Sequence, residues 1–331
     1  MNGTTAPTLE HLVRSRADLL LNGWTDRRIA NAIRGGALHQ IRRGWFIAAD
    51  ERKALWEEEK HRAHVIAVAR DSRGPGVMSH SSAAVLWRLP LWGMRLTRVH
   101  MTTDAPHRIS SSPDVHRHVA ALGPDDVNVI DGIRCTSLAR TVFDLIRVVP
   151  VEAAVAVADA AERQMAARGW EWDLDAVTSW RGGMQERLDA APGARGIRQA
   201  RWVSDFADGR AQLPGESVSR IQLFRLGFES PELQVPVDGP GGSRYFVDFG
   251  LKCIRVFGEF DGQGSTVMTL CAPGSRWSRC SSRRSGEKTG YAARPSGASH
   301  AGRRRTSRPR ERSDRGWRPS VSRHPERRPA S

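Results

Sequence analysis

Apolar positions in the first 50 residues change from helical to strand-like spacing, which divides this stretch into short elements. Leucines and a valine recur at helical spacing over 9–22, and this predicts a first helix that ends at Gly23. Thr25 precedes a second helical pattern over 26–34. Residues 37–47 alternate around an Arg-Gly turn and predict two short strands. Two helices followed by a basic hairpin are typical of a winged helix-turn-helix.

The next 150 residues mix the two periodicities. Amphipathic and alanine-rich stretches predict several helices, and alternating stretches between them predict strands. The expected helices are 53–70, 80–89, 138–148 and 151–167. The expected strands are 96–102, 114–120 and 127–135. Residues 168–214 favour further helices, so the middle of the chain is predicted to be an α+β domain.

A helix over 216–226 and strands at 232–237, 244–249 and 254–260 are predicted next, which begins a small sheet. Side chains alternate along a strand, so Glu259 and Asp261 share one face of the last strand. If the last two strands pair as a hairpin, Asp248 lies opposite Glu259. Carboxylates that converge in this way can hold Mg²⁺, which activates water against a phosphodiester. Glu216, on the preceding helix, is a further candidate ligand or orients one. The alternative is that these acids are solvated hairpin charges.

The composition changes abruptly at Gln263. From there to the end the chain has no Ile, no Phe and one Leu, and Arg, Ser, Gly, Ala and Pro make up 48 of 69 residues. A segment with so little apolar surface cannot offset its ordering entropy, so disorder is predicted. Two causes stay open. Either the segment is a natural basic tail, or the reading frame of a GC-rich gene shifts near codon 263.

The formal net charge of +15 suggests a nucleic-acid partner, but the charge is unevenly distributed. Residues 263–331 hold seventeen Lys and Arg against four Asp and Glu, whereas residues 1–262 hold 34 against 32. DNA contact by the folded part must therefore come from a local patch. Five arginines fall on the second predicted helix and the hairpin, where phosphate and groove contacts are expected: Arg27, Arg28, Arg34, Arg42 and Arg43. The alternative is a solvated basic face on a structural domain.

Cysteine spacing and apolar runs exclude several classes. Four cysteines without a CxxC spacing predict neither a disulfide framework nor a zinc ribbon. Cys271 and Cys280 combined with His300 or His324 fit no known zinc spacing. The N-terminus does not resemble a signal peptide, and no apolar run approaches the ~18 residues of a membrane span. We therefore expect a cytoplasmic protein with no membrane partner and no small-molecule cofactor.

Three other groups of residues invite a catalytic interpretation. His116 and His118 share a strand face, as metal ligands do, but no third ligand is evident and an exposed strand face is the favoured interpretation. His80, within Ser-His-Ser-Ser, is interpreted as part of a helix-capping turn. Arg140 and Asp144 lie four residues apart on a predicted helix and are interpreted as an ion pair.

The C-terminal motifs resemble the start of a PD-(D/E)XK nuclease domain of the very-short-patch-repair-like type. They are Pro-Gly-Glu-Ser-Val-Ser-Arg at 214–220, Val-Asp-Phe at 247–249 and Gly-Glu-Phe-Asp-Gly at 258–262. The resemblance implies that Asp248 and Glu259 are metal ligands and that Asp261 occupies a position often held by Lys. It ends at Gly262. The basic element that such catalysis needs is not recognisable beyond that point, which implies an incomplete α/β fragment.

The N-terminal part resembles the AbiEi-type antitoxin family of actinobacteria, whose members often carry such a nuclease-like domain. Three motifs in order support this: Gly-Ala-Leu-His-Gln-Ile-Arg-Arg-Gly-Trp-Phe at 36–46, Ser-His-Ser-Ser-Ala-Ala at 79–84, and Asp-Gly-Ile-Arg-Cys-Thr-Ser-Leu-Ala-Arg-Thr-Val-Phe-Asp-Leu at 131–145. The resemblance implies a winged-helix protein that binds DNA and represses its own operon, with a cognate toxin as a second partner.

These patterns predict an α+β chain of four parts. They are a winged helix-turn-helix at 1–50, an antitoxin-like α+β middle domain at 51–205, an incomplete restriction-endonuclease-like α/β fragment at 212–262 and a disordered Arg/Ser-rich tail at 263–331. The function expected is that of a DNA-binding, antitoxin-like transcriptional regulator. The alternatives are a Mg²⁺-dependent DNA endonuclease and a non-functional frameshifted product.

Overall fold

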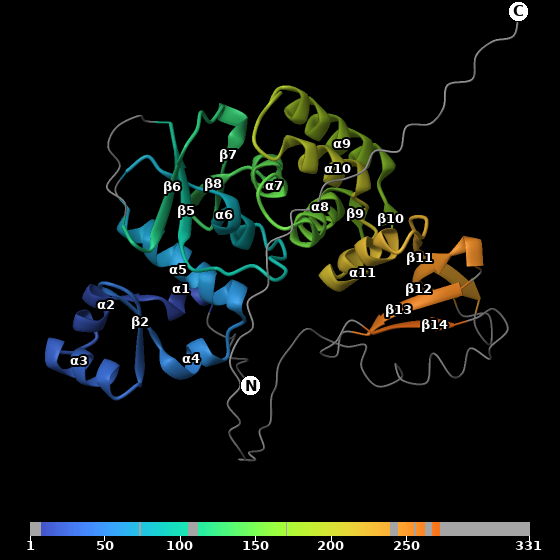
Figure 1. Ribbon diagram of the computed structural model, residues 1–331. Helices are drawn as coiled ribbons and strands as arrows, with labels where there is room; N and C mark the ends of the chain where they lie inside the picture. Colours follow the sequence, from blue (N-terminus) through green and yellow to red (C-terminus); the bar gives the residue numbers. More distant parts are fainter. Residues whose placement is uncertain are drawn as a thin grey trace, which may run out of the picture. The chain divides into compact units, whose positions relative to one another are not determined.

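The computed structural model describes residues 8–72, 74–104, 112–169, 171–238, 244–254, 256–261 and 267–271, which form an α+β structure (Figure 1). The chain divides into two compact units at Ser282, and every described residue belongs to the first. The α+β class expected from the sequence is confirmed. Among the described residues, no helix has the length and apolar character that a bilayer crossing requires.

The N-terminal elements alternate short helices with the strands of a three-stranded sheet. They are α1 (Leu9–Leu12), β1 (Arg14–Ser15), α2 (Arg16–Leu21), α3 (Asp26–Arg34), β2 (Leu38–Arg42) and β3 (Trp45–Ala48). The sheet has the order β1-β3-β2, with β3 antiparallel to both neighbours. Gly44 makes the turn between β2 and β3 with a φ of +80°, a conformation that favours glycine.

The single helix predicted over 9–22 is wrong, because the chain breaks around Val13 into two helices separated by β1. Ser15 and Asp18 form a capping box: the Asp18 N–H donates to the Ser15 hydroxyl, and the Ser15 N–H donates to the Asp18 carboxylate at 2.8 Å. This pair starts a new helix at Arg16. The next helix agrees with the prediction, since α3 begins after Thr25, whose hydroxyl accepts from the Arg28 N–H.

A five-stranded sheet and several helices make up the next part of the chain. In sequence order the elements are α4 (Ala49–Lys53), α5 (Glu57–Asp71), β4 (Val77–Met78), α6 (His80–Leu86), β5 (Val99–Thr103), β6 (Val115–Val119), the 3-10 helix η1 (Pro124–Asp126), β7 (Val127–Ile130) and β8 (Ile133–Thr136). The strand order is β6-β5-β4-β8-β7. The β5–β6 and β4–β8 pairs are parallel, and the other pairs are antiparallel.

One strand predicted over 127–135 is in fact the β7–β8 hairpin. Asp131 and Gly132 both have positive φ, 51° and 75°, which is the conformation of a two-residue hairpin turn. Apolar residues on either side hid the turn in the sequence, although Asp-Gly is itself a strong turn signal.

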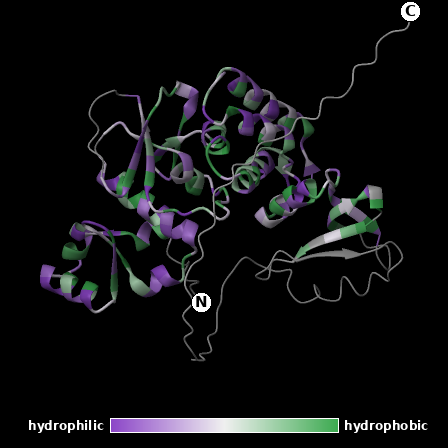
Figure 2. Ribbon diagram, in the orientation of Figure 1, coloured by the Kyte–Doolittle hydropathy of each residue, from purple (hydrophilic) through white to green (hydrophobic). Residues whose placement is uncertain are grey.

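Helices complete the middle of the chain and carry most of its core. They are α7 (Leu138–Ile146), α8 (Val151–Ala166), α9 (Leu174–Asp189) and α10 (Ile197–Phe206), with the short hairpin β9 (Ala167–Arg168) and β10 (Glu171–Trp172) between α8 and α9. Alanines and valines of α8 are buried against α7, α9 and α10. Figure 2 colours much of α7 and α8 as hydrophobic, whereas α3 is mainly hydrophilic.

A four-stranded antiparallel sheet follows α11 (Pro214–Arg225). Its strands are β11 (Glu232–Asp238), β12 (Arg244–Leu251), β13 (Val256–Asp261) and β14 (Val267–Cys271), in that spatial order, with the 3-10 helix η3 (Lys252–Ile254) between β12 and β13. The disorder predicted from residue 263 is wrong at β14, which pairs with β13 from Phe257 opposite Cys271 to Asp261 opposite Val267. Its apolar run, Val-Met-Thr-Leu-Cys, is the signal that the overall composition obscured. The rest of 263–331 lies outside the described residues.

Candidate functional site

The exposed face of α3 carries basic and amide side chains at helical spacing. Arg27, Asn31 and Arg34 are all exposed, whereas Ile29 on the opposite side is buried with Leu19 and others in a small core. Positions 27, 31 and 34 follow the i, i+4, i+7 pattern that lines one side of a helix. The core therefore holds α3 so that this polar face points to solvent.

The charged side chains of α3 also make contacts with neighbouring groups. Arg16 neutralises Asp26 at the start of the helix, with its Nε donating to Oδ1 at 2.8 Å. The Arg28 guanidinium lies over the Trp24 ring, 4.3 Å from its centroid, which is a cation–π contact. Arg34 donates to the Asn31 side chain at 2.5 Å. The acid at the helix start is paired, and the exposed face keeps its positive character.

Arg42 and Arg43 are adjacent in sequence but lie in different surroundings. Arg43 is exposed beside the β2–β3 turn. The Arg42 side chain is only 17% exposed and forms ion pairs with Asp71 at 3.3 Å and Asp114 at 3.2 Å. Burial raises the pKa of Asp114, but hydrogen bonds from Ser112 and His64 and the charge of Arg42 outweigh it, so the pKa is lowered. Arg42 thus serves an internal contact, and of the two only Arg43 is presented to solvent.

Two of the four predicted catalytic acids have described side chains, and both are buried. Glu216, 2% exposed, lies in the first turn of α11 and accepts from the Gln212 N–H at 2.8 Å. Asp248, 7% exposed, lies on β12 and accepts from the Phe260 N–H of β13 at 2.8 Å. The β12–β13 register pairs Phe249 with Gly258. Continued by one residue, this register would set position 248 opposite 259, the pair that the sequence predicts.

Phe260 connects the regions of these two acids. Its ring packs on the backbone of Gly215, where a Cβ would lie 2.0 Å from the ring. Gly215 precedes Glu216, and the Phe260 N–H binds Asp248. The side chains of Glu259 and Asp261 lie outside the described part of the chain, so their placement as metal ligands is untested.

The described acids do not by themselves make a magnesium site. Among the described residues, one group of three His, Cys, Asp or Glu side chains converges closely enough to hold a metal ion, and it contains neither Glu216 nor Asp248. Mg²⁺ requires several oxygen ligands in near-octahedral geometry. The fit of Mg²⁺ therefore depends on Glu259 and Asp261.

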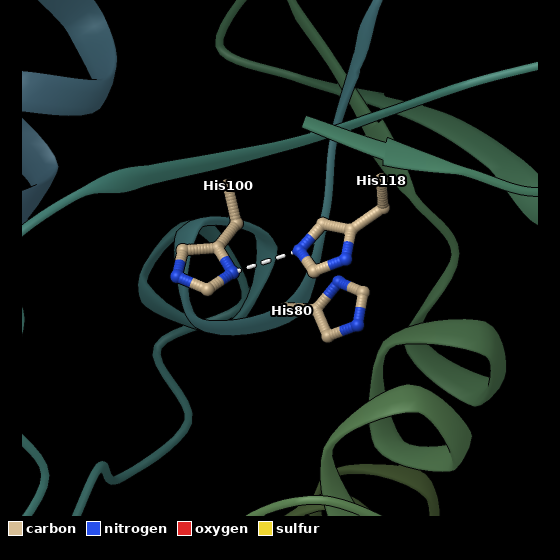
Figure 3. Close-up of side chains that lie close together, drawn as sticks. All are labelled: His80, His100 and His118. Atoms are coloured by element: carbon tan, nitrogen blue, oxygen red, sulfur yellow. Dashed lines mark hydrogen bonds between the residues drawn. The ribbon is translucent and has the colours of Figure 1, made fainter. Parts of the chain in front are cut away.

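That group of three is formed by His80, His100 and His118, whose ligand atoms all lie within 4.8 Å of one another (Figure 3). His100 Nδ1 and His118 Nε2 are 3.0 Å apart and hydrogen-bonded. The ring of His80 stacks on that of His118 with 3.8 Å between centroids. His116 stacks on the other side of His118 at 4.4 Å but is exposed.

The interpretation of the 116–118 strand as an exposed face without a third ligand is wrong for His118, which is partly buried between His80 and His116. His100 comes from the parallel neighbour β5, where it pairs with His116. The turn at His80 does begin α6, since Ser79 is its N-cap residue, but the Ser79 side chain makes no capping hydrogen bond. Its hydroxyl instead lies 3.1 Å from His80 Nδ1. His80 and His100 are thus the residues that the sequence interpretation missed.

Burial keeps these three imidazoles neutral. It lowers the pKa of His80 to about 2, with smaller contributions from the neighbouring His118 and His100. It likewise lowers the pKa values of His100 and His118 to about 4, helped by adjacent histidines. A neutral imidazole has a free lone pair on one ring nitrogen.

The Arg140–Asp144 ion pair predicted from the sequence is confirmed, with Nε and Oδ2 at 2.9 Å. It belongs to a larger network, because Arg140 also contacts Asp126 at 3.0 Å and Arg187 contacts Asp126 at 2.7 Å. Arg147 contacts Asp144 at 3.2 Å. The network joins η1, α7 and α9 and is structural.

The chain matches no known family model. It is 33% identical over 147 residues to the uncharacterized protein Rv2248 of Mycobacterium tuberculosis strain H37Rv, and equally to the uncharacterized protein MT2308 of strain CDC 1551. The match covers 44% of this chain and 48% of each relative, so the chain spans about half the length of the curated relatives it matches. The similarity connects part of the chain to mycobacterial proteins whose names state no activity.

Proposed function

We propose that this protein is a DNA-binding, antitoxin-like transcriptional regulator that contacts DNA through a winged helix-turn-helix at about 1–50. The observation that carries the proposal is the order α1-β1-α2-α3-β2-β3 together with a solvent-facing basic row on α3. A helix after a tight turn, followed by a two-stranded hairpin, is the arrangement in which a winged-helix protein presents its recognition helix.

The charges favour two kinds of DNA contact. Arg27 and Arg34 lie a little under two turns apart on α3, a spacing that lets both reach phosphates or base edges from one groove. Arg43, beside the hairpin turn, is placed to contact the backbone next to that groove. Arg28, over Trp24, is at the edge of this surface. We leave Arg42 out of the contacting set because its guanidinium is held by Asp71 and Asp114.

The antitoxin-like part of the proposal rests on the resemblance of the motifs at 36–46, 79–84 and 131–145 to AbiEi-type antitoxins. The resemblance implies that the DNA target is the operator of the protein's own operon and that a cognate toxin is its protein partner. The nearly balanced charge of residues 1–262, 34 basic against 32 acidic, means that specific binding has to come from the local surface on α3 and the hairpin.

The test is binding of the full chain to a duplex that covers the region upstream of its own gene, measured by fluorescence anisotropy at a salt concentration that releases random-sequence DNA. We expect the double variant Arg27→Ala, Arg34→Ala to bind about 10-fold or more weakly, because two charged contacts are lost. Arg198→Ala, an exposed arginine on α10, is the matched control and should bind like the wild type. Equal affinity of wild type and double variant would refute the proposal.

The second candidate function is a Mg²⁺-dependent DNA endonuclease. The observation that favours it is the burial of Glu216 and Asp248 on elements connected by Phe260. In the presence of Mg²⁺ the full chain should nick supercoiled plasmid, and Asp248→Asn should abolish nicking. Asp238→Asn, an exposed acid on the neighbouring strand β11, is the control. Nicking that persists in Asp248→Asn excludes this function.

A further inference from the structure

We propose that His80, His100 and His118 form a binding site for a divalent transition-metal ion, with Zn²⁺ as the expected occupant. The three come from distant parts of the middle domain: the start of α6, the parallel strand β5 and its neighbour β6. Neutral imidazole is a preferred ligand of Zn²⁺, Cu²⁺ and Ni²⁺ and a poor one for Mg²⁺. The site is therefore distinct from the acids at Glu216 and Asp248.

The spacing of the ligand atoms suits a tetrahedral ion. With Zn–N distances of about 2.0–2.1 Å, neighbouring nitrogens in a tetrahedral zinc site lie about 3.3 Å apart. His100 Nδ1 and His118 Nε2 are 3.0 Å apart, already close to that value. The other separations in the group do not exceed 4.8 Å. Coordination by all three requires the His80 ring to rotate out of its stack on His118, so that its in-plane lone pair points to the same ion. A metal ion would replace the proton that His100 and His118 share.

Protein contacts hold two of the ligands in position. The His100 N–H donates to the Ser82 hydroxyl at 2.8 Å, and the Ser79 N–H donates to the His100 carbonyl at 3.0 Å, so α6 is fastened to β5 beside the site. The Ser79 hydroxyl contacts His80 Nδ1 at 3.1 Å and orients that ring.

Two features of the same region lack another explanation. His80 has a φ of +50°, a backbone conformation that costs a non-glycine residue energy and is found preferentially at functional sites. Thr102, paired with His118 in the β5–β6 register and two residues from His100, is 1% exposed, and its hydroxyl has no hydrogen-bond partner within the described structure. A bound ion with its water would supply a polar partner next to Thr102.

The cluster also lacks the partner that histidines usually have. No carboxylate pairs with His80, His100 or His118 in the described part of the chain, whereas His64 nearby binds Asp114 at 3.1 Å. Three neutral imidazoles gathered in this way can supply nitrogen lone pairs to a cation. Three nitrogen ligands leave the fourth position of a tetrahedral ion to water or to a further ligand.

The direct test is metal binding by the full chain after removal of bound metal with a chelator. Titration calorimetry with Zn²⁺ should give one site per chain that is lost in His118→Gln and in His100→Gln, with affinity at least about 100-fold lower. Ser79→Ala should weaken binding about 10-fold through the orientation of His80. His116→Gln is the matched control, because His116 stacks on His118 but is not one of the three ligands, and it should bind like the wild type.

Two results would overturn the proposal. One is equal zinc affinity and stoichiometry in the wild type and His118→Gln, which would assign any binding to other residues. The other is equal loss in His116→Gln and His118→Gln, which would indicate a nonspecific histidine surface.

If a variant fails to fold, chemical modification of the wild-type protein with and without Zn²⁺ tests the site instead. Zn²⁺ should protect His80, His100 and His118 from diethylpyrocarbonate while His39 is still modified, and a lack of selective protection contradicts the site.

Discussion

Arg42 and Arg43 show how residue-level contacts separate two side chains that the sequence treats alike. Arg43 is exposed, and Arg42 is bound by Asp71 and Asp114. We predict that Arg43→Ala weakens DNA binding several-fold and leaves the free energy of unfolding unchanged. Arg42→Ala should instead lower that free energy by about 1–3 kcal/mol, since the partly buried Asp114 and the exposed Asp71 both lose their charged donor. Anisotropy and urea unfolding of both variants test this contrast, and the reverse pattern would contradict the assignment.

A second residue-level prediction concerns acid stability and Asp126. Burial raises the pKa of this carboxyl, but Arg187, the Gly123 N–H and Arg140 outweigh it, so its folded-state pKa lies below the usual value. The charged form then stabilises the fold above the unfolded-state pKa of about 3.9, and this stabilisation is lost as the pH falls through the lower folded-state pKa.

Wild type should therefore be more stable than Asp126→Asn at neutral pH, and the difference should shrink below about pH 4. Urea unfolding of both proteins between pH 3 and pH 7 measures it. A difference that stays constant over this range would show that the arginines do not stabilise the charged form. Asp125→Asn, an exposed neighbour, is the control and should show little effect at any pH.

At the level of elements, α8 and α11 are joined by a fully buried ion pair. Arg220 and Asp159, 3% and 1% exposed, lie 2.8 Å apart, and the arginine also donates to the Phe206 carbonyl at 2.6 Å. Removing one member leaves an uncompensated buried charge. Arg220→Met should cost about 3–5 kcal/mol of unfolding free energy.

The partner substitution tests the cause of that loss. Asp159 also accepts from the Asp208 N–H at 2.8 Å, a bond that Asn can keep. The double variant Asp159→Asn, Arg220→Met should therefore be more stable than Arg220→Met alone, because no charge is left unpaired. Denaturant midpoints of the three proteins settle this. A double variant less stable than Arg220→Met would mean that lost packing, not charge, dominates.

Local sequence signals were sufficient to predict elements that begin or end at a capping or turn residue. The start of α3 followed from Thr25, and the β2–β3 hairpin from its Arg-Gly turn. They failed where two elements compete over a few residues, as at Val13, where β1 interrupts a helical pattern. They also failed at β14, because the average composition of the tail hid an apolar run of five residues.

The histidine group could not be predicted for a different physical reason. His80, His100 and His118 meet through a parallel pairing of β5 with β6 and through the position of α6, and no local periodicity encodes either. The pairing of the strands that carry Asp248 and Glu259 was predictable, because a hairpin register follows from short-range spacing. Contacts across a hairpin can be predicted from the sequence, whereas contacts between elements that are distant in sequence can be identified only once the fold is known.

At the scale of the whole molecule, charge is separated along the chain. Residues 263–331 hold seventeen basic and four acidic side chains, so we expect this segment to bind any polyanion electrostatically. DNA binding by the full chain is thus expected on random sequence too, with steep salt dependence. Such binding says nothing about α3, and a test of the central claim has to report where on the chain DNA is contacted.

Hydrogen–deuterium exchange of the full chain, with and without DNA from upstream of its own gene, is the most direct measurement. At a salt concentration that releases random DNA, we predict slower exchange across 24–47, which includes α3 and the β2–β3 hairpin. The α10 segment around Arg198 should be unaffected. Protection confined to residues beyond 271, or none at all at that salt concentration, would contradict the assignment of DNA binding to the winged helix.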